Sequence, residues 1–98
     1  MPRAHEVMIH EEVTTERLRQ VAKWGAERDQ ILARGGDMGR YTHHKLAVLM
    51  EEVGESAKEV LERNPTKLRT ELIQCAAVAI AFVAGLDELL QTPTVPSG

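Results

Sequence analysis

The sequence contains little of what several protein classes depend on. Cys75 is the only cysteine, which excludes an internal disulfide and a cysteine-based zinc cluster. Aromatic residues make up only 3% of the chain, and the aromatic, β-branched alternation typical of strands is missing. The net charge of −3 provides no bulk attraction to nucleic acid or to an anionic membrane. These absences favour a helical protein over a disulfide scaffold, a sheet protein or a nucleic-acid-binding protein.

Long apolar runs are absent as well. The longest uncharged apolar stretch covers residues 75–86, which is shorter than the roughly 20 residues that a helix needs to cross a bilayer. The segment from Met1 to Glu6 lacks the apolar core of a signal peptide. We therefore expect a soluble cytoplasmic protein with no membrane partner.

Helical patterning runs through most of the chain. Apolar spacing predicts helices over residues 15–33, 42–63 and 66–90, in an all-α antiparallel bundle that forms one domain over residues 1–91. Residues 34–39 hold three glycines and predict a loop, and residues 92–98 predict a disordered tail. Asn64-Pro65 predicts a helix end followed at once by a helix start. The second helix carries an apolar stripe of Leu46, Leu49, Met50, Val53, Ala57, Val60 and Leu61; the first carries one that includes Leu18, Val21, Ala22 and Trp24.

The third predicted helix is apolar on nearly every face between Leu72 and Leu86. Such a helix must be covered on several sides, and two further helices from one 98-residue chain barely suffice. We therefore expect a homo-oligomer, a homodimer or homotetramer, that completes the core of the bundle.

Carboxylates form a row on the second predicted helix. Glu52, Glu55 and Glu59 share a face at helical spacing, and Glu51 lies one turn before Glu55. A row of this kind is often a solvated acidic face. Four neighbouring negative charges repel one another, however, and a hard divalent cation such as Mg2+ would compensate them because it prefers oxygen ligands.

The third predicted helix adds Glu71 and Gln74 to this row. Folding the chain about Asn64-Pro65 brings Gln74 level with Glu55, and Glu71 level with Glu59 and Lys58. The two helices would then present an oxygen-rich pocket between them. An ordinary ion pair of Glu71 with Lys58 or Lys67 is the alternative.

The order and spacing of these acids resemble the MazG-like members of the all-α nucleoside triphosphate pyrophosphohydrolase superfamily. That family carries an EExxE motif on one helix and an ExxD motif on the next. Here the first motif is Glu51-Glu52-Val53-Gly54-Glu55, and the second begins with Glu71 but ends in Gln74 instead of Asp. The resemblance covers about residues 24–90, including Lys23-Trp24-Gly25.

The resemblance implies Mg2+-dependent hydrolysis of a nucleoside triphosphate to the monophosphate and pyrophosphate. It assigns Glu52, Glu55, Glu71 and Gln74 to the metal, with Glu52 and Glu55 as catalytic residues, one of them a general base. Gln74 offers a neutral oxygen in place of a charged ligand, which weakens metal binding. Two alternatives stay open: a phosphoribosyl-ATP pyrophosphohydrolase, and a noncatalytic helical module that binds a nucleotide or a protein partner.

Two further residues are candidates for substrate binding. Lys45 precedes Glu52 by seven residues on nearly the same helical face, which suits a phosphate contact as well as a solvent-exposed lysine. Trp24 would stack on a nucleobase or anchor the core or an interface. Of His43 and His44, only one can line a pocket, and the segment from Arg34 to Tyr41 is either a closing loop or a plain connector. No motif reads a particular base.

Overall fold

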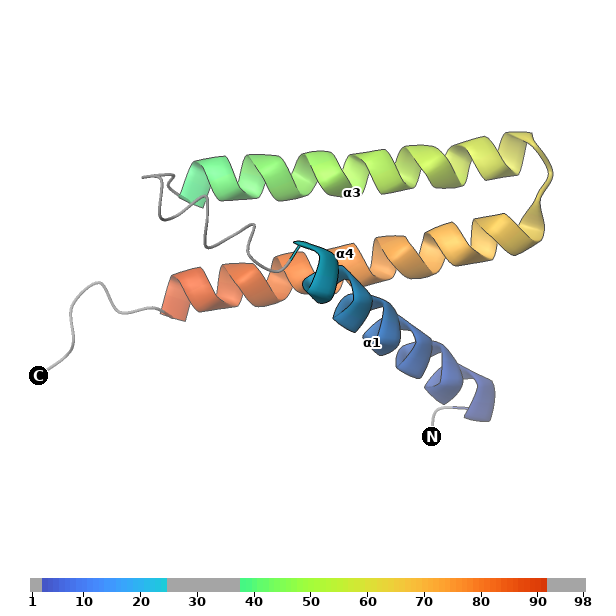
Figure 1. The fold of residues 1–98 in the computed structure, drawn as a ribbon, viewed down its shortest axis with the longest axis horizontal. Helices are drawn as coiled ribbons and strands as arrows, with labels where there is room; N and C mark the ends of the chain where they lie inside the picture. Colours follow the sequence, from blue (N-terminus) through green and yellow to red (C-terminus); the bar gives the residue numbers. More distant parts are fainter. Residues whose placement is uncertain (1–2, 25–37, 92–98) are drawn as a thin grey trace, which may run out of the picture.

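The computed structural model describes residues 3–24 and 38–91. These residues form three helices and no strand: α1 (Ala4–Trp24), α3 (Met38–Leu61) and α4 (Pro65–Gln91). Figure 1 shows α3 and α4 side by side as an antiparallel hairpin, with α1 crossing α4 at an angle. The expected all-helical character is thereby confirmed.

The turn between α3 and α4 follows from its local sequence. Asn64 N–H donates to the Glu59 carbonyl (3.0 Å) and Arg63 N–H to the Val60 carbonyl (3.1 Å), which is the Schellman pattern for ending a helix. Arg63 takes the left-handed φ of 55° that this pattern needs. Asn64 then caps α4, because its side-chain oxygen accepts the Lys67 N–H at 3.1 Å and Pro65 occupies the first helical position. The predicted stop and restart is confirmed.

Two predicted helix starts are wrong. α1 begins at Ala4 instead of residue 15, because Thr14 lies inside the helix and its hydroxyl donates to the His10 carbonyl (3.0 Å), one turn earlier, instead of capping. α3 begins at Met38 instead of residue 42, so Gly39 is helical and not part of a loop. Residues 25–37 and 92–98, which hold the rest of the predicted loop, the end of the first predicted helix and the tail, lie outside the described residues.

The face that α3 turns toward α4 is not its apolar stripe. Tyr41, Ser56 and Glu59 are buried, and Ser56 Oγ lies 3.5 Å from Cys75 Sγ of α4. By contrast, most of the apolar stripe is exposed: Leu46, Met50, Val53, Ala57, Val60 and Leu61. The spacing had identified a real apolar face, but most of that face packs against none of the described residues. The same holds on α1, where Leu18 and Val21 are exposed while Val13 and Gln20 are buried.

The core of one chain is correspondingly small. Among the described residues, only Val13, Tyr41, Ala77 and Val78 are buried hydrophobics, and no large side chain is fully buried. Leu72, Ile80, Val83 and Leu90 of α4 are all exposed. α4 is also the one helix in the described part of the chain that is long and apolar enough to cross a membrane, judged by length and composition alone. Cys75, expected to be buried, is half-buried.

α1 packs across α4. Besides the apolar contact around Val13, a bidentate ion pair joins the two helices: both terminal nitrogens of Arg69 donate to the Glu12 carboxylate at 2.7 Å. This pair is exposed to solvent, so it orients α1 on α4 more than it stabilises the fold.

Candidate functional site

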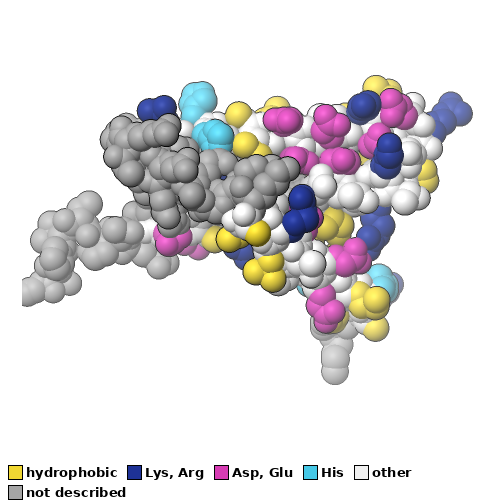
Figure 2. Space-filling view, in the orientation of Figure 1, with side chains coloured by type: hydrophobic (Ala, Val, Ile, Leu, Met, Phe, Trp, Pro, Cys, Tyr) yellow, Lys and Arg dark blue, Asp and Glu magenta, His cyan; other side chains and the backbone are white. Residues whose placement is uncertain are grey.

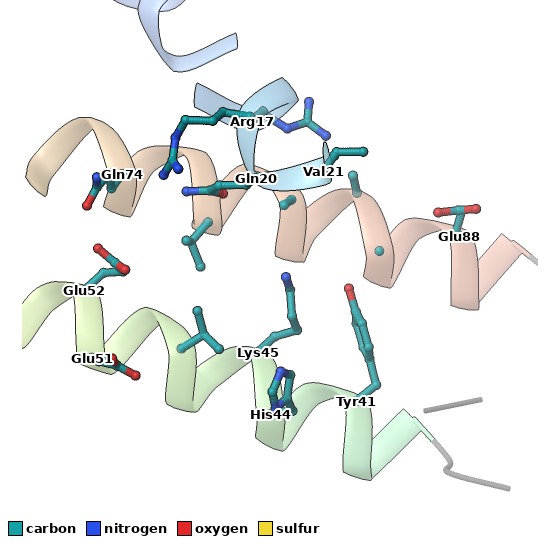
Figure 3. Close-up of a pocket in the computed structure, with 16 residues that line it drawn as sticks. Arg17, Gln20, Val21, Tyr41, His44, Lys45, Glu51, Glu52, Gln74 and Glu88 are labelled. Atoms are coloured by element: carbon teal, nitrogen blue, oxygen red, sulfur yellow. The ribbon is translucent and has the colours of Figure 1, made fainter. Parts of the chain in front are cut away.

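All three helices line one cavity of about 710 Å³. Its α3 wall is a line of side chains spaced by three or four residues, Tyr41, Lys45, Val48 and Glu52. α4 faces this line with Gln74, Val78 and Gly85, among others, and α1 supplies Arg17, Arg19, Gln20 and Val21. Figure 3 shows Glu52 and Gln74 facing each other at one end, with Lys45 and Tyr41 reaching toward α4 further along.

The acidic end of the cavity joins α3 to α4. The Gln74 amide nitrogen donates to Glu52 Oε2 at 3.0 Å and to Glu71 Oε2 at 2.9 Å; an amide oxygen in that place would face only acceptors. Glu52 and Glu71, nineteen residues apart in the sequence, are thus drawn together. In this antiparallel pair the Ser56–Cys75 contact places Glu55 level with Ala76 and Gln74 level with Ala57, so Glu55 and Gln74 lie about two residues, or roughly 3 Å along the axis, away from the predicted level register.

Like charge and burial act together on Glu52. Its pKa is raised above the usual value, first by burial, then by the negative charge of Glu71 and a hydrogen bond with that carboxyl, and further by Glu51 and Glu55. Figure 2 shows acidic side chains gathered along α3. A carboxyl whose ionisation is disfavoured by its neighbours is a position that a cation would stabilise.

The residues present fit a magnesium ion of the kind found with nucleotides. Within residues 3–24 and 38–91, no three His, Cys, Asp or Glu side chains form a ready-made ligand cluster. Mg2+ nevertheless needs only one or two protein carboxylates when phosphate oxygens and waters complete its shell. Glu52 and Glu71 provide such a pair, and Gln74 would turn its amide oxygen toward the ion.

Glu55 and Glu51 hold different positions from Glu52. Glu55 is exposed and acts on Glu52 through its charge. Glu51 is exposed too, but it lines the cavity at the acidic end. Of the four predicted metal ligands, the structure therefore brings Glu52, Glu71 and Gln74 into contact and leaves Glu55 beside them. The alternative ion pairs of Glu71 with Lys58 or Lys67 are absent among the described side chains.

A cation faces the acidic end from α1. Arg19 donates to Glu16 from Nε (2.9 Å) and from a terminal nitrogen (2.6 Å), and Gln20 donates to the same carboxylate at 3.1 Å. These bonds lower the pKa of Glu16, chiefly through Arg19. The negative charge of Glu52 in turn raises the pKa of Arg19, although less than Glu16 does. Arg19 is therefore fixed where its charge partly offsets the carboxylates.

The predicted substrate residues have mixed outcomes. Lys45 is half-buried and lines the cavity. His44 also lines it, whereas His43, its neighbour on the helix, is exposed and does not. The side chain of Trp24 lies outside the described residues, so stacking on a base stays a prediction.

Sequence reasoning missed the contribution of α1 and placed Tyr41 in a closing loop or connector, whereas the residue lies in α3. Arg17, Gln20 and Val21 recur at helical spacing, but polar residues on a surface helix carry no signal that a second helix faces them. Tyr41 is buried against Phe82, with ring centroids 6.3 Å apart in an edge-to-face arrangement. A Cβ on Gly85 would overlap the Tyr41 hydroxyl, so this contact depends on a glycine 44 positions away.

Comparison with known protein families, with characterised proteins and with solved structures finds no match for this chain.

Proposed function

We propose that this protein is a cytoplasmic, Mg2+-dependent nucleoside triphosphate pyrophosphohydrolase of the MazG-like kind. One observation carries the proposal: Glu52 of α3 and Glu71 of α4 are bridged by Gln74 at the acidic end of a shared cavity. Lys45 stands in that cavity seven residues before Glu52, or about 10 Å along the helix axis. Glu52 and Glu71 are suited to bind a cation, and Lys45 is suited to bind a phosphate group. Their separation along the cavity fits an extended polyphosphate that carries a metal ion.

In this proposal Glu52 and Glu71 hold the metal through their carboxylates, and Gln74 adds a neutral oxygen. When bound, the ion would neutralise phosphate charge and make a water more acidic. Glu55, one turn beyond Glu51 on α3, is the candidate general base, with Glu52 as the second catalytic carboxylate. Val48, which lies between Lys45 and Glu52 in the sequence of α3, and Val78 of α4 add apolar lining to the cavity, and an apolar lining strengthens the electrostatic attraction between the cavity and charged groups of a ligand.

The proposal includes a homodimer or homotetramer. At about 100° per residue, the exposed apolar side chains of α3 lie on the same flank as Ser56, and those of α4 on the same flank as Cys75. Ser56 contacts Cys75, so both sets occur on one side of the hairpin. Gln74 marks the opposite side, where α1 and the cavity lie. Two hairpins that pair through the apolar side would form a four-helix bundle and leave the cavity open.

Release of pyrophosphate tests the activity directly. The purified protein is incubated with Mg2+ and a panel of ordinary and modified nucleoside triphosphates, with phosphoribosyl-ATP included to separate the two enzymatic alternatives. We expect release from at least one compound, a loss of at least a hundredfold in Glu52→Gln, and no change in Glu62→Gln, an exposed glutamate at the turn. Activity of Glu52→Gln equal to that of the unchanged protein would contradict the assignment.

The second candidate is a noncatalytic module that binds a nucleotide or a protein partner. The observation that favours it is the same Gln74 amide, which satisfies both carboxylates by hydrogen bonding without a metal. Nucleotide binding that is independent of Mg2+, with no pyrophosphate release from any compound, would favour this module over the enzyme.

A further inference from the structure

The cavity is also lined by a cationic side chain of α1, Arg17. Arg17 Nε is buried, and no described residue accepts a hydrogen bond from it. A guanidinium stays charged at every relevant pH and can only donate hydrogen bonds. Leaving such a donor unpaired is unfavourable, so the buried Nε points to an acceptor that the described residues do not supply.

Lys45 reaches the same cavity from a different helix. It is half-buried, and Figure 3 shows its amine pointing from α3 into the space between α3 and α4. Among the described residues it forms no ion pair. The carboxylates that line the cavity form no ion pair with Lys45. Glu51 and Glu52 lie at the acidic end, and Glu88 of α4 has another interaction.

Arg19 differs from these two cations. Glu16 already holds it in a two-pronged ion pair, and its remaining attraction is toward Glu52. Arg17 and Lys45, which form no ion pair among the described residues, therefore line a cavity that has Glu51 and Glu52 at one end and Glu88 toward the other (Figure 3).

We infer that Arg17 of α1 and Lys45 of α3 form an oxyanion site for a phosphate group of a polyphosphate. This site adds a phosphate-binding role to the proposed function. It rests on that function only for the identity of the complete substrate, because a phosphate group alone would pair with both cations. A guanidinium donates two parallel hydrogen bonds from its planar fork to two phosphate oxygens, and a lysine adds a compact positive charge. Because α1 packs on α4, an anion bound by both residues would also link α1 to α3.

The test uses inorganic tripolyphosphate without metal, in EDTA, with the full chain. Calorimetry would give the affinity, and thermal unfolding would report stabilisation by the ligand. We expect Lys45→Met and Arg17→Met each to weaken binding at least tenfold. Matched variants of exposed cations, Lys58→Met and Arg3→Met, should stay within twofold of the unchanged protein. Arg17→Lys retains charge but not the fork, and we expect an intermediate loss.

Glu52→Gln separates this site from the metal end of the cavity. Removing a negative charge there should leave tripolyphosphate affinity equal or higher while Mg2+-dependent activity is lost. Circular dichroism of every variant verifies that the helices are intact, and Arg17→Lys provides the comparison if Arg17→Met loses helix.

Two results would overturn the oxyanion site: no binding of tripolyphosphate at millimolar concentration, or losses in Lys45→Met and Arg17→Met no larger than in the matched variants. Failure of the enzyme proposal looks different. A protein that hydrolyses no nucleotide but binds tripolyphosphate through Arg17 and Lys45 keeps the anion site and loses the activity. Conversely, a protein that hydrolyses a nucleotide but does not bind tripolyphosphate in the absence of metal keeps the enzyme proposal and loses the anion site.

Discussion

At the scale of single residues, Gln74 decides how the acidic end behaves without a metal. Its amide donates to Glu52 and Glu71 together, so it bridges two carboxylates that would otherwise repel each other. The aspartate of the family motif, placed there, would instead add a third negative charge. The hydrogen bonds of Gln74 thus stabilise the two carboxylates without a cation, and in the proposed enzyme the same residue would bind a metal more weakly than an aspartate.

Gln74→Asp should reverse this exchange. We expect the variant to have a lower unfolding temperature than the unchanged protein in EDTA, because three carboxylates then converge, and to regain more stability as Mg2+ is added. Gln74→Met is the matched variant: it also removes the amide, but supplies no ligand, so Mg2+ should not restore it. Thermal unfolding across a Mg2+ titration measures both. Equal Mg2+ responses of Gln74→Asp and Gln74→Met would contradict the role given to this position.

The lowered pKa of Glu16 predicts how the stability of the protein changes in acid. This pKa is lowered, chiefly by the hydrogen bonds from Arg19, so the folded protein binds a proton there less readily than the unfolded chain. The stability that Glu16 contributes is therefore present above its ordinary pKa of 4.5 and is lost as the pH falls through the lower, folded-state value. The loss should be less than about 1 kcal/mol, because Arg19 is half-exposed.

Denaturant unfolding between pH 6 and pH 3 would measure this contribution. In Glu16→Gln the decline of stability with acid should be shallower than in the unchanged protein. Glu11→Gln, an exposed neighbour on the same helix for which the structure records no ion pair among the described residues, serves for comparison. A pH profile of Glu16→Gln that matches the unchanged protein would exclude an energetic role for the Arg19 pair.

At the scale of helices, the sequence predicted the hairpin well and its packing poorly. Asn64-Pro65 specifies the turn through local hydrogen bonds, which is why the boundaries between α3 and α4 could be predicted to within about two residues. The acidic motifs needed only this register to bring Glu52, Glu71 and Gln74 together. α1 was harder, because neither its start at Ala4 nor its approach to the cavity has a local signal. Periodicity identifies an apolar face but not which partner covers it.

Gly54 and Gly85, two of the glycines inside the described helices, distinguish the effect of side-chain packing from the effect of helix propensity. Gly85 lies where α4 meets the Tyr41 ring, and Gly54 has open space around it. We expect Gly85→Ala to destabilise the protein by roughly 1–3 kcal/mol, since the Tyr41 hydroxyl must move. Gly54→Ala should stabilise the chain by about 0.5–1 kcal/mol through helix propensity. Denaturant unfolding gives both values.

The same pair also reports on the cavity. Tyr41 lines it beside Lys45, so a displaced ring in Gly85→Ala should weaken tripolyphosphate binding, while Gly54→Ala leaves it unchanged. If Gly85→Ala were as stable as the unchanged protein, the close contact between Tyr41 and α4 would not exist in solution. A destabilised Gly54→Ala would instead show that something covers that position, as a second chain would.

At the scale of the whole molecule, the apolar side of the α3–α4 hairpin is exposed and available to pack against a second chain. α3 has 24 residues and is therefore about 36 Å long, so two adjacent helices present a face of roughly 36 by 20 Å. That is about 700 Å², close to the ~800 Å² per partner of a stable interface. A membrane could cover the same side instead. Glu71 and Gln74, which contact Glu52 from α4, would then lie in or beside the lipid, where burying polar groups costs free energy.

Val53 lies in the middle of this face on α3 and is about half-exposed in the single chain, as is Val7 on α1. We expect sedimentation equilibrium to show a dimer or tetramer in buffer without detergent, with an unfolding temperature that rises with protein concentration. Val53→Glu should shift the population to monomer and lower that temperature, because an ionised carboxylate would be buried between two hairpins. Val7→Glu, outside the hairpin, should change neither. A monomer that stays folded at micromolar concentration would refute the paired hairpins, and a protein that requires detergent to remain in solution would assign the apolar side to lipid.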